Sequence, residues 1–118
     1  MVLVDTSVWV EHFRSGSIGL DALLNDGQVL CHPFIVGELA CGNLKNRPVI
    51  LSLLQELPMA VRAEDAEILQ CIDHHRLMGR GLGYIDMHLL MSAILTRAPL
   101  WTLDRRLREV TQDLGLTH

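Results

Sequence analysis

The chain has 118 residues, 49% of them hydrophobic, and a formal net charge of −4 at pH 7. This length and composition predict one domain with a single core over residues 1–118. The net charge argues against a basic protein that holds nucleic acid by electrostatics alone. No apolar run approaches the roughly 20 residues of a membrane span, and the first residues lack the basic lead of a signal peptide. We therefore expect a soluble, cytoplasmic protein without a membrane segment.

Apolar runs of strand length alternate with longer helical patterns along the chain. The patterns predict strands at 2–4, 28–32, 59–61 and 100–103, with a short edge strand at 116–117. They predict helices at 6–14, 18–24, 33–42, 48–57, 63–78, 86–96 and 104–113. Strands separated by helices favour an α/β fold, a three-layer α/β/α sandwich around a parallel sheet of four to five strands. In such folds the functional site lies at the carboxyl ends of the strands.

Four carboxylates occupy positions that do not suit an ordinary surface acid. Asp5 and Asp104 each follow directly after an apolar strand. Glu38 and Asp86 share helical stripes with apolar residues and should point towards the core. Buried carboxylates without partners are costly, so four of them in one sheet edge call for cations. Oxygen-only ligands favour a hard divalent ion, Mg²⁺ or Mn²⁺.

A simpler interpretation exists for each acid taken alone. Asp5, Asp86 and Asp104 could each cap the amino end of a helix, where aspartate is strongly preferred. Glu38 could be a partly exposed helix residue. The coincidence of all four at strand ends or inward helix faces favours the metal site, and capping does not explain Glu38.

These residues stand in segments that resemble the motifs of a known family. The chain resembles the PIN domain, and more narrowly the VapC-type toxins of bacterial toxin–antitoxin pairs. The similar segments are residues 4–10 around Asp5, 35–39 around Glu38, 84–93 around Asp86 and 100–107 around Asp104. Each motif is weakly specific alone, but their order and spacing over nearly the whole chain are specific. The chain is somewhat short for the family, and the last motif has no second acid close by.

The resemblance implies a Mg²⁺- or Mn²⁺-dependent endoribonuclease that cuts transfer, ribosomal or messenger RNA and so inhibits translation. It implies that Asp5, Glu38, Asp86 and Asp104 form the catalytic metal site. Thr6, Ser7 and Thr102 are polar neighbours that could orient these acids by hydrogen bonds. The family also implies a homodimer and a small VapB-like antitoxin as partner.

Other polar and reactive residues receive more modest predictions. Arginines flank the last two acidic motifs and, as a group, are interpreted as contacts to RNA phosphates: Arg76, Arg80, Arg105, Arg106 and Arg108. Trp9 and Trp101 are predicted to pack in the core. The three cysteines are predicted to be buried free thiols, because they form no C-x-x-C pair. No role is predicted for any histidine.

Two other classes of function fit the sequence less well. A phosphatase of the haloacid-dehalogenase type needs a second aspartate two residues after the first, where this chain has Ser7. A response-regulator receiver needs a late lysine, and no lysine follows Lys45. A non-catalytic PIN-like module that binds metal, RNA or protein without cutting remains the main alternative to the nuclease.

Overall fold

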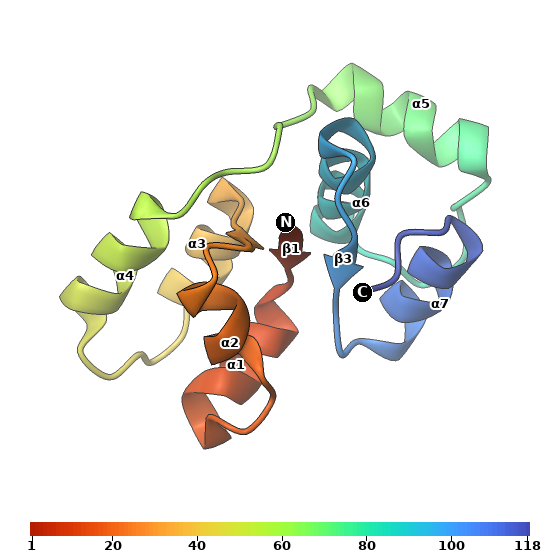
Figure 1. The fold of residues 1–118 in the computed structure, drawn as a ribbon. Coiled ribbons are helices and arrows are strands. Elements are labelled where there is room, and N and C mark those ends of the chain that lie inside the picture. Colours follow the sequence, from red (N-terminus) through yellow and green to blue (C-terminus); the bar gives the residue numbers. More distant parts are fainter.

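The computed structural model describes residues 1–118 and shows three short strands and seven helices (Figure 1). The strands are β1 (Val2–Val4), β2 (Val29–Leu30) and β3 (Leu100–Trp101). The helices are α1 (Thr6–Ser15), α2 (Leu20–Asn25), α3 (Pro33–Ala40), α4 (Arg47–Glu56), α5 (Asp65–His75), α6 (Tyr84–Thr96) and α7 (Arg105–Asp113). This confirms the predicted α/β fold class.

The sheet is parallel, with β1 in the middle and the order β2-β1-β3. Leu3 lies opposite Leu30 of β2 and Leu100 of β3, and all three side chains are buried. Because all strands run the same way, their carboxyl ends meet at one edge. Asp5, which follows β1, and Thr102, which follows β3, therefore emerge side by side.

The predicted fourth and fifth strands shrink to single bridges. Met59 pairs only with Cys31, and Thr117 pairs only with Leu100. The predicted strand at 59–61 is wrong, because the chain turns away from the sheet directly after Met59. The backbone N–H of Val61 donates to the Thr96 hydroxyl of α6, at 2.9 Å, instead of to a strand. The partner strand also ends there, because Pro33 begins α3 two residues after Cys31.

The helices form two groups around the sheet. In Figure 1, α1 to α4 gather on one side of the strands and α5 to α7 on the other. Helix α3 contacts α1 and α4 in the first group, and α5 packs on α6 in the second. The sheet and the inward helix faces form one core of 25 buried hydrophobic residues. None of the helices combines the length and apolarity that a membrane span requires.

Most predicted helices are present with shifted ends. The predicted helix 63–78 is shorter, because the chain leaves helical geometry at Arg76, which has a positive φ of 53°. The predicted start at Asp86 is two residues late, so Asp86 lies inside the first turn of α6. The prediction of three buried thiols is wrong for Cys41, which is exposed because α3 ends at the residue before it.

Candidate active site

Asp5 is the buried acid at the centre of the site. Its side chain is only 6% exposed at the carboxyl end of β1, directly before α1. It stands at the N-cap position of α1 but makes no capping hydrogen bond. Instead, Oδ2 accepts hydrogen bonds from the Ser7 and Thr102 hydroxyls, both at 2.8 Å. Capping therefore does not explain this aspartate.

Thr102 connects the ends of β1 and β3. Its hydroxyl donates to Asp5 and also accepts the backbone N–H of Asp104 at 3.1 Å. Asp104 in turn caps α7, because its Oδ1 accepts the Leu107 N–H at 3.0 Å. The backbone N–H of Leu103 donates to the Ser7 hydroxyl at 3.0 Å. These bonds hold the loop after β3 against the start of α1.

Asp86 is placed in the same region by α6. Its Oδ2 accepts the backbone N–H of Gly83 at 3.0 Å, which fixes the side chain against the first turn of the helix. Burial raises the pKa of Asp86, and the neighbouring Asp5 and Asp104 carboxylates raise it further, although the Gly83 bond acts in the opposite direction. Asp86 therefore lies close enough to Asp5 and Asp104 for their negative charges to affect its pKa.

Glu38 lies on α3, at the side of α1. Its side chain is half-buried, and Oε1 accepts the Thr6 hydroxyl at 2.8 Å. Thr6 directly follows Asp5 in the chain, so this bond ties Glu38 to the residue next to the buried acid. Glu38 is less deeply placed than the apolar stripe predicted.

The four acids share one pattern of hydrogen bonding. In each, one carboxylate oxygen accepts a bond from the protein, while the other oxygen accepts none. None of them forms an ion pair with a basic side chain. Carboxylates held by one oxygen keep a hard oxygen donor for a divalent cation, and their orienting partners are the hydroxyl and amide groups typical around metal ligands. The donor set therefore fits Mg²⁺ or Mn²⁺. No three of the acids lie close enough together to form a complete metal site.

Comparison with known proteins identifies the family of this chain. A family model described as "PIN domain" matches residues 2–112, a range that includes all four acids. The chain belongs to the PIN-domain family. It is 44% identical over 117 residues to "Ribonuclease VapC32" from two strains of Mycobacterium tuberculosis, CDC 1551 / Oshkosh and ATCC 25618 / H37Rv. Each alignment covers 98% of this chain and 94% of the relative, and it confirms the predicted likeness to VapC-type proteins.

The arginines of this PIN domain divide into paired and unpaired side chains. Arg80 forms an ion pair with Asp113 at 2.8 Å, and Arg105 approaches Glu109 at 3.4 Å. Arg76 and Arg106 form no ion pair. The side chain of Arg106 covers Gly81 so closely that an added Cβ there would lie 2.7 Å from a guanidinium nitrogen. Part of the predicted phosphate-binding charge is thus already neutralised.

Two residues that position the PIN-domain site escaped the sequence analysis. No role was predicted for Gly83, yet its backbone N–H donates to Asp86 Oδ2 at 3.0 Å. The spacing from Gly83 to Asp86, three residues before a helical pattern, is the available signal. His32 is fully buried and caps α3, because its Nδ1 accepts the Phe34 N–H at 2.9 Å. No sequence pattern marks this role, because histidine is not a preferred cap.

Proposed function

We propose that this chain is a Mg²⁺- or Mn²⁺-dependent endoribonuclease that uses Asp5, Glu38, Asp86 and Asp104. The observation that supports this most directly is the shared pattern of the four acids. Each is oriented through one oxygen, each keeps the other without a protein donor, and no basic side chain neutralises them. Such a concentration of negative charge suits a cation-assisted reaction at a phosphate.

The chemistry follows from the charge and the hydrogen bonds of these residues. A bound divalent cation would lower the pKa of a water molecule and neutralise charge on the phosphate. Asp5, Asp86 and Asp104 would hold it directly or through water. Ser7 and Thr102 keep the Asp5 carboxylate in one orientation, and Gly83 does the same for Asp86. Glu38, anchored by Thr6, would act as a further ligand or accept a proton from the attacking water.

The biological role that we propose is the toxin of a toxin–antitoxin pair. The relatives that share 44% of its residues are named ribonuclease VapC32. By this likeness the substrate would be transfer, ribosomal or messenger RNA, and cutting it would inhibit translation. Hydrolysis by activated water leaves a 5′ phosphate and a 3′ hydroxyl.

The decisive experiment is cleavage of mixed transfer and ribosomal RNA by the purified, antitoxin-free chain. Reactions contain Mg²⁺, Mn²⁺ or EDTA, and an Asp86→Asn variant runs in parallel. Cutting that requires metal and disappears in the variant supports the proposal. Cutting that the variant retains contradicts the assignment of the site, and 2′,3′-cyclic phosphate ends contradict the mechanism.

A non-catalytic module is separated from the nuclease by the same preparation. If Mn²⁺ raises the melting temperature of the chain but not that of Asp86→Asn, while no RNA is cut, the chain binds metal without catalysis. If metal affects neither cutting nor melting, the proposed metal site itself is wrong.

The proposed partners are a VapB-like antitoxin and a second copy of the chain. An apolar cavity of about 460 Å³ lies between α1, α2 and α4 and is lined by Trp9, Phe13, Leu53 and other residues. Val49 and Leu53 on α4 are also more than half exposed. This apolar surface supports a protein partner on these helices. Light scattering of the chain alone measures dimerisation, and co-purification with the cognate antitoxin tests the antitoxin as a partner.

A further inference from the structure

A glycine-rich connection leads from α5 to α6 and contains Gly79, Gly81 and Gly83. Gly79 and Gly81 have positive φ values of 74° and 81°, a backbone conformation that favours glycine whatever lies nearby. Their surroundings differ. A Cβ added at Gly79 would meet nothing within 4 Å, whereas one added at Gly81 would lie 2.7 Å from Nη1 and 2.9 Å from Cδ of Arg106. Gly81 therefore also leaves room for the Arg106 side chain.

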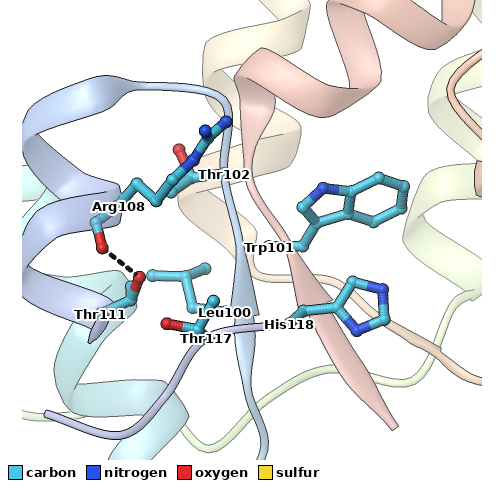
Figure 2. Close-up of a pocket in the computed structure, with 7 residues that line it drawn as sticks. All are labelled: Leu100, Trp101, Thr102, Arg108, Thr111, Thr117 and His118. Carbon is cyan, nitrogen blue, oxygen red and sulfur yellow. Dashed lines mark hydrogen bonds between the residues drawn. The ribbon is translucent and has the colours of Figure 1, made fainter.

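The Arg106 guanidinium packs against this connection without a charged partner. It forms no ion pair, and its side chain donates no hydrogen bond to the protein. Arg80 in the same connection differs, because it pairs with Asp113 of α7 at 2.8 Å. Arg108, two residues after Arg106, extends along β3 instead (Figure 2). Packing on Gly81 thus restricts the Arg106 side chain, while its N–H donors remain available to a ligand.

This guanidinium lies next to the acidic site. Gly81 is two residues before Gly83, so their Cα atoms are at most about 7 Å apart. The Gly83 N–H donates to Asp86 at 3.0 Å, and Arg106 itself follows two residues after Asp104. The clustered acids repel every phosphate of an approaching RNA strand. A cation fixed on this side offsets that repulsion for one phosphate, to which a guanidinium can donate two parallel hydrogen bonds.

We propose that Arg106, held in place on Gly81, binds a backbone phosphate of the RNA strand one or two nucleotides from the phosphate that is cut. Gly81 is a positioning residue, which acts on binding only through the arginine. Among the arginines that flank the acidic motifs, this assigns a phosphate contact to Arg106. The inference rests on the proposed ribonuclease function for its ligand, but binding of RNA can be measured without cleavage.

The test is binding of a labelled, mixed-sequence, single-stranded RNA 12-mer in EDTA, followed by fluorescence anisotropy at several salt concentrations. Arg106→Gln removes the charge. We expect it to weaken binding roughly fivefold or more and to reduce the salt dependence by about one phosphate contact. The control is Arg97→Asn, which removes an exposed, unpaired arginine near the amino end of β3, at the opposite edge of the sheet from the acids. Arg97 has a positive φ of 57°, which asparagine tolerates, and this variant should stay within about twofold of the parent chain.

The two glycines separate positioning from folding. Gly81→Ala and Gly79→Ala place the same methyl group at similar positive φ values, so both should lower the melting temperature by a similar amount. Only the methyl group at position 81 displaces the Arg106 side chain. We expect Gly81→Ala to weaken RNA binding roughly threefold or more and Gly79→Ala to stay within about twofold of the parent chain. Adding Gly81→Ala to Arg106→Gln should weaken binding no further, because the two changes remove the same contact.

Several results would overturn the proposal. Absent binding, or binding equally strong in Arg106→Gln, would remove the phosphate contact. Equal effects of the two glycine variants on binding, or a further loss in the double variant, would show that Gly81 acts through the fold and not through Arg106. Metal-dependent cutting together with Arg106-independent binding removes the contact and leaves the nuclease. Arg106-dependent binding without cutting keeps the contact and contradicts the nuclease.

Discussion

The side chain before the helix that follows β1 bonds differently from the side chains at the equivalent positions after β2 and β3. Each of the three strands leads within three residues to the residue that precedes a helix: Asp5 before α1, His32 before α3 and Asp104 before α7. His32 and Asp104 cap their helices with their side chains. Asp5 leaves its helix uncapped and accepts hydrogen bonds from Ser7 and Thr102 instead.

This difference shows that one local position can serve local structure or the assembled site. An aspartate before a helix gains about 1 kcal/mol by capping it. Asp5 makes no such bond, and its Oδ2 accepts two hydroxyl donors, one of them from the far end of the chain. Asp104 caps its helix through Oδ1, and its Oδ2 accepts no bond from the protein. The following variants test this division of roles.

Asp5→Asn should abolish cleavage while the fold remains. We expect a loss of more than roughly 100-fold in kcat/KM, since even the groups that orient metal ligands contribute about 10- to 100-fold. The amide can still accept the Ser7 and Thr102 bonds, so the melting temperature should hold. The matched control is His32→Asn, which changes the equivalent position after β2 and should retain cleavage. Equal losses in both variants would show that Asp5 has no special role.

Thr102→Val should impair catalysis more than its small change in shape suggests. The hydroxyl orients Asp5 and accepts the Asp104 N–H, so its removal frees two groups of the site. We expect cleavage to fall about 10- to 100-fold. Thr96→Val removes a threonine hydroxyl that accepts only the Val61 N–H, far along α6 from the site. Kinetics of both variants against the same RNA separate the roles; comparable rates would refute the orienting role.

The His32 position should control part of the acid stability of the fold. Burial lowers the pKa of His32 from 6.5 to about 4, and His88 and Arg62 contribute in the same direction. Between these values the unfolded chain binds a proton that the folded chain does not, so the free energy of unfolding falls as pH decreases through this window. The expected loss is on the order of 3 kcal/mol. His32→Asn keeps a capping oxygen and should show a flatter stability curve from pH 7 to pH 4 in urea titrations. Parallel curves would contradict this.

Asp104 should separate stability from catalysis. Asp104→Ala removes the α7 cap and should cost about 1 kcal/mol of unfolding free energy. Asp104→Asn keeps a good cap, so its stability should stay close to that of the parent chain. Both variants should lose cleavage, because both remove the charged oxygen. Chemical denaturation combined with the RNA assay measures the two effects; full activity in Asp104→Asn would leave capping as its only role.

The sequence predicts which acids follow the strands because that signal is local. Asp5 and Asp104 directly follow apolar runs, and parallel strands bring such residues to one edge regardless of detail. The exact contacts depend on tertiary structure. The Val61 N–H donates to the Thr96 hydroxyl instead of to a strand, so the predicted strand at 59–61 does not form. Cys41 is exposed because α3 ends at the residue before it, and Trp101 of the edge strand β3 is only partly buried. These partners lie far apart in the chain, so no local pattern records them.

The bond between Thr102 and Asp5 spans 97 positions of the chain. Protein synthesis proceeds from the amino end, so Asp5 leaves the ribosome long before its partner exists. Until the residues after β3 emerge, Asp5 lacks the Thr102 hydroxyl, Asp104 is absent, and β1 has only one of its two neighbouring strands. The order of synthesis therefore delays assembly of these contacts until the residues after β3 have been made.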